Sequence, residues 1–274
     1  MPIPLNLPPT FARVLDTRAE QTLGQSETKS GTPKSLIGMW VSSGSPVNAE
    51  ICAGSGVEWL LIDGEHSPLS LESIQLQLQA VAAYPVTPVV RVPENSQVLI
   101  KQYLDLGAQN LLVPMVNTPE DAEAAVCAVR YPPQGVRGVG SALSRGGRWG
   151  RIAQYLKDAN EEYVSLTVQI ESVEAVENAE QIAATDGVDT VFIGPSDLAA
   201  TMGFIGQQDH PQVVEAIHSA IAAVRRAGKP VGINAFDPNL AQSYIDGGID
   251  FILVGADVSL LARGSENLAA RYLG

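Results

Sequence analysis

The feature that most constrains the fold is an alternation of short apolar runs with amphipathic stretches, which begins near residue 35 and continues to the C-terminus. Runs of four to six mostly apolar residues predict eight buried strands, at residues 36–41, 59–62, 88–92, 110–115, 166–171, 190–194, 231–234 and 251–255. A helical pattern separates each strand from the next. This order predicts an α/β fold, namely a (β/α)8 TIM barrel. A doubly wound sheet is the weaker alternative, because no Gly-x-Gly-x-x-Gly follows the first strand.

The length of the chain fits one such barrel. It has 274 residues, of which 45% are hydrophobic, and a barrel typically needs about 250. We assign residues 31–274 to a single barrel domain and residues 1–30 to an irregular N-terminal extension, with one short helix over 11–23 and a polar segment over 24–31. Residues 1–10 lack the basic stretch of a signal peptide, and no apolar run reaches the ~18 residues of a membrane span. The expected location is the cytoplasm, without membrane contact.

The charge of the chain limits its partners. Seventeen basic and 30 acidic residues give a formal charge of −13, which repels nucleic acids and anionic membranes. A small anionic substrate would need a local cation, either an arginine or a metal ion. Four arginines lie in the glycine-rich segment 135–151, which we expect to be a long loop that contacts another subunit. Cys52 and Cys127 are expected to be buried free thiols.

A weak repeat marks the start of four of the strands. A glycine and then a polar residue two positions later precede the apolar run, in Gly56-Val-Glu58, Gly107-Ala-Gln109, Gly187-Val-Asp189 and Gly248-Ile-Asp250. The glycine suits the left-handed backbone conformation that ends a helix. We therefore expect the polar residue to mark the solvent-facing rim at the amino end of the barrel.

Barrel enzymes place their chemistry at the carboxyl ends of the strands. The polar residues there are Asp63, Glu65, His66, Arg91, Gln169, Glu171, Asp197, Asn234 and Asp257. Glu171 and Asp197 end neighbouring strands about 4.8 Å apart, so their carboxylates can converge on one cation. Oxygen ligands alone favour a hard divalent ion such as Mg²⁺ or Mn²⁺. The alternative, that both acids are helix caps, stays open at this point.

Three further observations bear on the chemistry. An arginine at the end of a buried strand, Arg91, suits a substrate carboxylate, although a surface ion pair is the alternative. His66 is the only histidine at a strand's carboxyl end, and its alternative is an ordinary loop histidine. None of the five lysines falls at such an end, which disfavours a Schiff-base mechanism.

Residues 35–274 resemble the HpcH/HpaI aldolase family, the metal-dependent class II pyruvate aldolases typified by 4-hydroxy-2-oxoheptanedioate aldolase. The motifs that carry the resemblance are Leu60-Leu-Ile-Asp-Gly-Glu-His66, Pro88-Val-Val-Arg91, Leu111-Leu-Val-Pro-Met115, Arg130-Tyr-Pro-Pro133, Arg137-Gly-Val-Gly-Ser-Ala142, Gln169-Ile-Glu171 and Phe192-Ile-Gly-Pro-Ser-Asp-Leu198. The resemblance implies a phosphoenolpyruvate/pyruvate-type barrel whose last helix is exchanged with a neighbouring subunit. It also implies a homohexamer built as a trimer of dimers.

The resemblance assigns roles to individual positions. Glu171 and Asp197 match the family's metal ligands, which hold Mg²⁺, Mn²⁺ or Co²⁺. Arg91 matches the arginine that binds pyruvate. The remaining matches are the catalytic base His66, Asp105 as the acid that orients it, Asp63 and Gln169 around the metal and its waters, and Ser196 among the substrate contacts. Asn234 departs from the family, which has an apolar residue near the aldehyde end of the substrate, so the identity of the aldehyde is open.

These observations predict a carbon–carbon lyase that reversibly cleaves a 4-hydroxy-2-oxo acid to pyruvate and an aldehyde, with a divalent metal ion. A phosphoenolpyruvate mutase or lyase, or a citryl-type lyase on the same barrel, is the alternative. A barrel that binds pyruvate without turning it over is a third hypothesis. The final helix, expected to start at a Ser259 cap, has an apolar face that a second subunit would cover.

Overall fold

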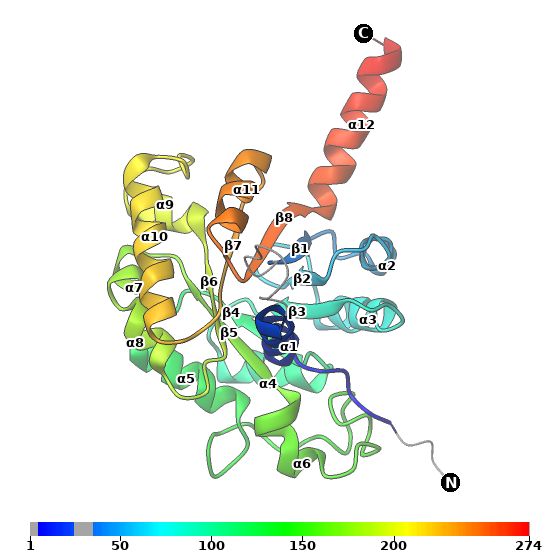
Figure 1. Ribbon diagram of the computed structural model, residues 1–274. Helices are drawn as coiled ribbons and strands as arrows, with labels where there is room; N and C mark the ends of the chain where they lie inside the picture. Colours follow the sequence, from blue (N-terminus) through cyan, green and yellow to red (C-terminus); the bar gives the residue numbers. More distant parts are fainter. Residues whose placement is uncertain (1–4, 25–34, 274) are drawn as a thin grey trace.

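The computed structural model describes residues 5–24 and 35–273, and its centre is a closed barrel of eight parallel strands (Figure 1). The strands pair in sequence order, and the last pairs with the first. They are β1 (Leu36–Val41), β2 (Trp59–Asp63), β3 (Thr87–Arg91), β4 (Asn110–Val113), β5 (Ser165–Ile170), β6 (Thr190–Ile193), β7 (Val231–Asn234) and β8 (Phe251–Ala256). The TIM-barrel prediction is confirmed, and the doubly wound alternative is excluded because the sheet closes.

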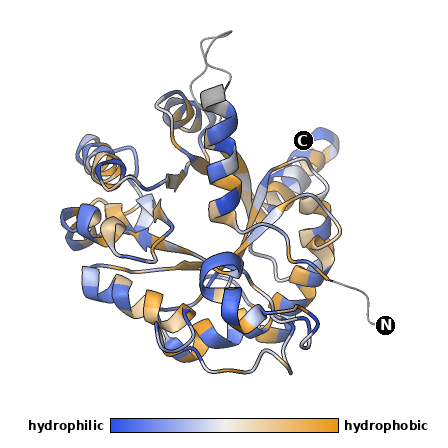
Figure 2. Ribbon diagram, turned by 60° about the horizontal axis from the view of Figure 1, so that its bottom comes forward, coloured by the Kyte–Doolittle hydropathy of each residue, from blue (hydrophilic) through white to orange (hydrophobic). Residues whose placement is uncertain are grey.

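Helices surround the barrel, and their hydrophobic residues lie toward the strands (Figure 2). They are α2 (Pro46–Ala53), α3 (Leu71–Val81), α4 (Gln97–Asp105), α5 (Pro119–Val129), α6 (Tyr155–Asp158) with the π-helical turn η1 (Ala159–Tyr163), α7 (Val173–Glu177), α8 (Ala179–Ala184), α9 (Pro195–Thr201), α10 (Pro211–Arg226), α11 (Pro238–Asp246) and α12 (Asp257–Leu273). Side-chain caps start several of them. Thr118, for example, accepts from the Asp121 backbone, and Asp121 accepts from the Thr118 backbone in return.

Six of the eight strands divide their side chains between two hydrophobic clusters, whereas β5 and β7 contribute only to the outer one. In β1, Met39 and Val41 point outward into the layer between strands and helices, whereas Leu36 and Trp40 point into the barrel. Besides Leu36 and Trp40, the interior cluster holds Trp59, Leu61, Val89, Leu112, Phe192, Phe251 and Leu253. This alternation explains why the strands read as continuous apolar runs, since both faces are buried.

The amino end of the barrel is closed by helix α1 (Phe11–Gly24). Phe11 is fully buried, and its ring lies 5.1 Å from the rings of both Trp59 and Phe251. Its backbone N–H donates to Asn110 Oδ1 at 2.7 Å. The short helix expected over residues 11–23 is therefore present, and it packs into the barrel instead of lying apart from it. Of the polar segment expected over 24–31, residues 25–31 fall outside the described residues.

The four strand-start glycines have positive φ, from +77° at Gly248 to +96° at Gly56 and Gly187, as expected. The polar residues that follow do more than face solvent. Glu58, Asp189 and Asp250 each accept a backbone N–H from the preceding strand in the barrel, at 2.7 to 3.0 Å. These half-buried carboxylates thereby tie neighbouring strands together at the amino rim.

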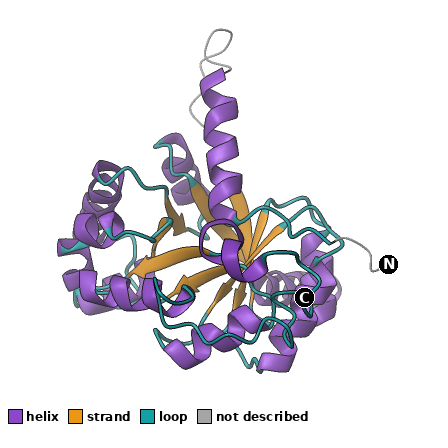
Figure 3. Ribbon diagram, turned by 90° about the horizontal axis from the view of Figure 1, so that it is seen from below, coloured by secondary structure: helices purple, strands orange, loops and turns teal. Residues whose placement is uncertain are grey.

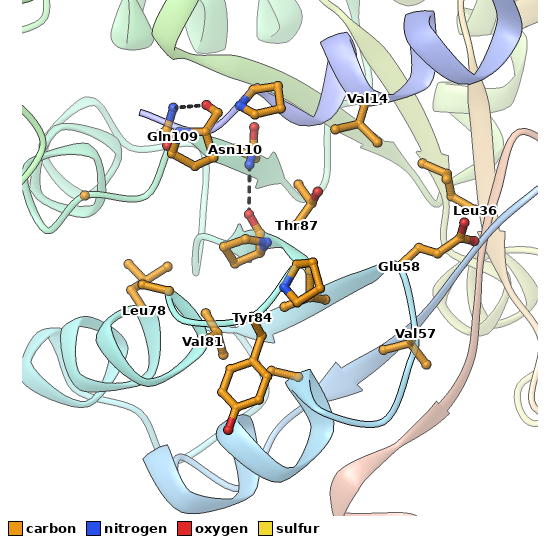
Figure 4. Close-up of a pocket in the computed structure, with 18 of the residues that line it drawn as sticks. Val14, Leu36, Val57, Glu58, Leu78, Val81, Tyr84, Thr87, Gln109 and Asn110 are labelled. Atoms are coloured by element: carbon orange, nitrogen blue, oxygen red, sulfur yellow. Dashed lines mark hydrogen bonds between the residues drawn. The ribbon is translucent and has the colours of Figure 1, made fainter. Parts of the chain in front are cut away.

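Seen from below, the ribbon shows helices arranged around the strands of the barrel (Figure 3). A cavity of about 820 Å³ lies at the amino end, between α1 and the start of β2 and β3 (Figure 4). Its walls are mostly apolar, with Val14, Leu78, Val81 and Tyr84 among the lining side chains. It contains none of the polar residues from the carboxyl ends of the strands. The cavity is therefore separate from the candidate active site.

Three expectations about local structure need correction. The last helix begins at Asp257, so Ser259 lies inside it and is not its cap. Cys52 is buried as expected, but Cys127 is exposed on α5. Two arginines of segment 135–151, Arg137 and Arg145, are buried, and the exposed side chains there include Val139 and Leu143. No helix in the described residues combines the length and apolar character needed to cross a bilayer.

Candidate active site

The carboxyl ends of β2 and β3 place an acid beside an arginine. The two strands pair in register so that Asp63 lies opposite Arg91, each being the last residue of its strand. Arg91 Nε and one terminal nitrogen both contact Asp63 Oδ1 at 2.8 Å, and the other terminal nitrogen lies 2.7 Å from Glu65 Oε2. Arg91 is only 5% exposed, so the surface ion-pair alternative is excluded.

Asp63 also shapes the loop after β2. Its carboxylate accepts the backbone N–H groups of Glu65 at 3.0 Å and His66 at 3.4 Å, and the hydroxyl of Ser67 at 3.2 Å. A carboxylate with this many donors is held in one orientation. Asp63 therefore fixes both the guanidinium of Arg91 and the turn that carries Glu65 and His66.

The guanidinium of Arg91 stacks on an aromatic ring. Its guanidinium carbon is 4.5 Å from the centroid of Trp40, which points into the barrel from β1. Trp40 in turn meets Phe192 edge-on, with centroids 6.4 Å apart. The Trp40 ring thus covers one face of the guanidinium, and two carboxylates contact its nitrogens. This arrangement fixes the plane of the guanidinium.

Glu171, directly after β5, is a buried carboxylate that two donors hold. The backbone N–H of Met115 donates to its Oε1 at 2.8 Å, and the side-chain amide of Gln169 donates to its Oε2. Burial raises the pKa of Glu171 to about 7, and the nearby charges of Asp197 and Glu65 act in the same direction while both hydrogen bonds oppose it. The helix-cap alternative does not describe this residue, because Ser172 caps α7.

Gly194, at the end of β6, keeps space open beside this carboxylate. A Cβ at Gly194 would lie 2.8 Å from Glu171 Oε2 and 3.0 Å from the amide nitrogen of Gln169. Asp197 follows in the first turn of α9, whose first residue is a proline. The glycine therefore allows Glu171, Gln169 and the start of α9 to approach one another.

The donor set at this position fits a hard divalent cation. Asp197 and Glu65 lie close enough to Glu171 for their charges to raise its pKa. The pKa of Glu65 is also raised, chiefly by burial. Gln169 Oε1 is buried without a hydrogen-bond partner in the described part of the chain, whereas Glu65 Oε2 is paired with the Arg91 guanidinium at 2.7 Å. No cluster of three or more His, Cys, Asp or Glu ligands forms among those residues. Two carboxylates that leave positions for water and substrate suit Mg²⁺ or Mn²⁺ better than zinc.

The structure does not bring His66 and Asp105 together. The His66 side chain is 67% exposed, and its Nε2 lies 3.9 Å from Glu65 Oε2. Asp105 is the last residue of α4, which runs back from the carboxyl end of β3 to the amino end of β4. There it lies 3.7 Å from Arg137, and its Oδ1 has no hydrogen-bond partner among the described residues. Within one chain the two side chains therefore lie at opposite ends of the barrel.

Ser196 and Asn234 flank the acidic cluster. The Ser196 hydroxyl, in the first turn of α9, accepts from the amide of Gln208 at 2.6 Å. Asn234 ends β7 and is half-buried. Asp257, the remaining strand-end acid, accepts the backbone N–H groups of Ser42 and Ser43 and so orders the loop after β1. Asp257 has a structural role in this position.

Two residues of this site were not assigned a role from the sequence. Glu65 appears among the strand-end residues, but nothing in the sequence shows that its carboxylate reaches Arg91 and His66. Trp40 sits one residue before the end of β1. The rule that barrel sites lie at the carboxyl ends of strands could have found it, had that rule been applied to aromatic as well as polar side chains.

Comparison with known proteins gives consistent matches across the barrel. The chain is 53% identical to the hydroxypyruvate/pyruvate aldolase of Deinococcus radiodurans over 236 residues, which is 86% of this chain and 85% of that protein. It is 52% identical to the 4-hydroxy-2-oxo-heptane-1,7-dioate aldolase of Salmonella dublin over 244 residues, covering 89% and 92% of the two chains.

A solved structure supports the same relationship. An HpcH/HpaI aldolase/citrate lyase family protein from Burkholderia cenocepacia J2315 superimposes with a TM-score of 0.84 at 40% identity, covering 92% of this chain and all of that one. Residues 36–264, which span the whole barrel, match the sequence model of the HpcH/HpaI aldolase/citrate lyase family. The chain therefore belongs to the HpcH/HpaI aldolase/citrate lyase family.

Proposed function

We propose that this protein is a metal-dependent aldolase that reversibly cleaves a 4-hydroxy-2-oxo acid to pyruvate and an aldehyde. The observation that carries the proposal is the arrangement at the carboxyl ends of β2, β3, β5 and β6. There Arg91 contacts Asp63 and Glu65, and Glu65 and Asp197 lie near the buried carboxylate of Glu171. Both relatives described above are named as aldolases that act on 2-oxo acids, which supports this chemistry over the mutase and citryl-lyase alternatives.

In this proposal Glu171 and Asp197 hold a divalent ion, and Gln169 lies beside it. The bound ion supplies Lewis-acid stabilisation of the negative charge that develops on the 2-oxo oxygen. Glu171 is suited to that role because its pKa of about 7 leaves its proton easy to displace by a cation. Asp63 contributes indirectly, since it fixes Arg91 and the 63–67 turn.

Arg91 binds the anionic end of the substrate. Asp63 holds the Nε edge of the guanidinium, Glu65 contacts its other terminal nitrogen and Trp40 covers one face, so its remaining N–H groups point in a fixed direction. A planar fork held this way can donate to a carboxylate or to a developing oxyanion without first reorganising. Ser196, at the start of α9, lies on the side of Asp197 and completes the polar rim.

His66 removes the proton from the C4 hydroxyl during cleavage and returns it during synthesis. Its exposed ring stands at the mouth of the barrel, next to Glu65. Within one chain Asp105 lies at the other end of the barrel from His66. Only Asp105 of a neighbouring subunit can therefore orient His66. An imidazole can accept and return a proton in this way.

The exposed apolar surface supports an assembly. Helix α12 projects from the barrel (Figure 1), and its side chains Leu260, Leu261 and Leu268 are exposed. We propose that α12 packs on a second copy, within a cytoplasmic homohexamer built from dimers. Leu143, 88% exposed in the loop after α5, belongs to the same contact.

Incubation of the protein with pyruvate and a panel of aldehydes, read by mass spectrometry, tests the reaction. We expect aldol products with Mg²⁺ or Mn²⁺, none after exhaustive treatment with EDTA, and recovery when the metal is restored. Borohydride added with pyruvate should trap no adduct on a lysine. Full activity after chelation, or a trapped lysine, would overturn the metal-dependent mechanism.

A further inference from the structure

The cavity at the amino end of the barrel has no part in the aldol chemistry, which lies at the opposite end. Its volume of about 820 Å³ is within the range of pockets that hold small organic ligands. Helix α1 lies on one side of it, and the ends of α2 and α3 lie on the other (Figure 4). Apolar side chains such as Val14, Leu78 and Val81 form most of the walls. Walls of this kind favour a ligand with an apolar part.

Two arginines of segment 135–151 line one part of the same cavity. Arg145 is 9% exposed and Arg148 is half-buried. A Cβ added at Gly107 would lie 2.5 Å from Nη1 of Arg145 and 3.2 Å from Nη1 of Arg148. Both guanidinium groups therefore approach the same point on the backbone, and the glycine leaves room for them.

No acidic side chain among residues 5–24 and 35–273 balances these two charges. Arg145 donates to the carbonyl oxygens of Leu78 and Leu106, at 3.3 and 3.2 Å. Arg148 in turn donates to the carbonyl oxygen of Arg145 at 2.6 Å. Burial and the charge of Arg148 lower the pKa of Arg145 to about 10. Carbonyl oxygens carry only a partial negative charge, so a bound anion would offset the repulsion between the two cations.

The backbone holds Arg148 in a conformation that non-glycine residues rarely adopt. Arg148 and its neighbour Trp149 both have positive φ, +51° and +56°. The turn that carries them is closed by two backbone hydrogen bonds of 2.9 Å, from Arg148 to Arg145 and from Trp149 to Ser144. Backbone of this kind persists where the surrounding structure holds it, and it is concentrated at functional sites. The turn thereby fixes the position of Arg148 beside the cavity.

The opposite side of the cavity has no free charge of this kind. Figure 4 shows Leu78 and Glu58 on opposite sides of the space, and Arg145 lies on the side of Leu78. On the other side, Glu58 pairs with Arg18 of α1 and accepts the backbone N–H of Ile37 at 3.0 Å. The cavity therefore has one cationic end and an apolar interior, which suits a ligand with a single anionic head group.

From these observations we infer that the cavity binds an amphipathic organic anion, with its carboxylate or phosphate head group on Arg145 and Arg148 and its apolar tail along Val14 and Val81. Guanidinium groups suit such heads, because their planar N–H donors match two oxygens at once. A ligand in this place would contact α1, α3 and segment 135–151 together and would stabilise the folded protein. The site is separate from the proposed aldolase chemistry and does not depend on it.

Titration calorimetry of the full chain with four probes that share an eight-carbon tail tests the head group. The probes are octanoate, octyl phosphate, 1-octanol and octylammonium. We expect at least one of the two anions to bind about tenfold more tightly than the alcohol, and the ammonium to bind more weakly still. The tighter anion identifies the head group. Acetate should bind far more weakly than octanoate, because it lacks the apolar tail. Equal affinities for the alcohol and both anions, or no binding of either anion, would overturn the inference.

Substitutions locate the binding. Arg148→Gln removes one charge but keeps a donor for the Arg145 carbonyl, and it should weaken binding of the tighter anion about tenfold. Arg151→Gln, at an exposed position of the same segment, should bind as the wild type does. Arg91→Gln should also bind normally, because Arg91 lies at the other end of the barrel. If Arg148→Gln folds poorly, Val14→Trp fills the apolar part and should block binding with both arginines in place. Wild-type affinity in the folded site variant, or loss of binding in Arg91→Gln, would overturn the site.

Discussion

The two ends of this barrel both bury carboxylates, but they treat them differently. At the amino end, Glu58, Asp189 and Asp250 each accept a backbone N–H from the neighbouring strand. At the carboxyl end, acids are grouped with one another and with Arg91, and Gln169 Oε1 is left without a hydrogen bond in the described part of the chain. The amino end is also closed by Phe11, whereas the carboxyl end has no such cover from α1.

This contrast separates structural acids from functional ones. A carboxylate that accepts a strand N–H stabilises the sheet through that hydrogen bond. A carboxylate placed near other carboxylates, as Glu171 is, costs free energy unless a cation is present. The partners of each acid, and not its burial alone, therefore indicate what it does. Four predictions test this difference, from the largest expected effect to the smallest.

Replacing Glu171 with glutamine should have the largest effect. We expect aldol turnover to fall about 10³-fold, because removal of a single group that stabilises developing charge costs 10²–10³ and metal affinity is lost as well. Titration calorimetry with Mn²⁺ would measure the affinity separately from the rate. Glu174→Gln, on the exposed side of α7, is the matched control. A Glu171→Gln variant that binds Mn²⁺ normally would place the metal elsewhere.

Replacing His66 with alanine should reduce aldol turnover about 10²-fold, the usual contribution of a general base. Mn²⁺ affinity should be unchanged, since the imidazole is not part of the carboxylate set. Proton exchange of the pyruvate methyl group, followed by NMR, should suffer less than turnover. His210→Ala is the control, because His210 lies at the start of α10, where its Nδ1 accepts from Gln212. Near-normal turnover in His66→Ala would remove this residue from the mechanism.

The amino end should respond in stability and not in rate. Phe11→Ala removes a ring packed between Trp59 and Phe251, and truncation of a buried phenylalanine costs about 3–5 kcal/mol of unfolding free energy. Denaturant unfolding would measure this loss, while kcat at a temperature well below the transition should stay near the wild-type value. Thr17→Ala, on the exposed side of α1, should change neither. A large fall in kcat for Phe11→Ala would show that the two ends are coupled.

The smallest effect concerns pH and the amino rim. Burial raises the pKa of Asp250, against the opposing effects of its hydrogen bond from Val231 and the charge of Arg225. The folded protein therefore keeps this proton to a higher pH than the unfolded chain, whose aspartates titrate near pH ~4. The stabilising contribution is complete below that pH and is lost as the pH rises through the folded pKa.

Asp250→Asn cannot titrate and should lack this dependence. The unfolding free energy of the wild type minus that of Asp250→Asn should accordingly be most favourable to the wild type near pH 4 and decline toward pH 7. Urea titrations across that range would measure it, with the exposed Asp246→Asn as control. A difference that grows with rising pH would contradict the raised pKa.

Much of this architecture could be predicted from the sequence because a parallel barrel buries both faces of each strand. The apolar runs therefore marked all eight strands, and the polar residues that ended them, such as Asp63 and Arg91, do meet at one end. The role of α1 could not be predicted, since it depends on Phe11 packing against Trp59 and Phe251, which are far away in the sequence.

The errors have physical causes of the same kind. Ser259 looked like a cap because serine commonly is one, but Asp257 follows β8 directly and the helix begins there. The pairing of Asp105 with His66, which came from the resemblance, stays a prediction. Asp105 lies at the end of a returning helix and thus at the other rim of its own barrel, so the pairing requires Asp105 of a second subunit.

The bare backbone at Gly194 has a consequence for how this protein can change over generations. Any side chain at Gly194 would press on Glu171 and Gln169. The closed sheet, and helix α1 at its amino end, lie away from this position and would persist. One nucleotide change could thus produce a descendant that still folds but no longer performs chemistry. Lineages that keep the barrel as an inert scaffold or a sensor of 2-oxo acids would be recognisable by a side chain at this single position.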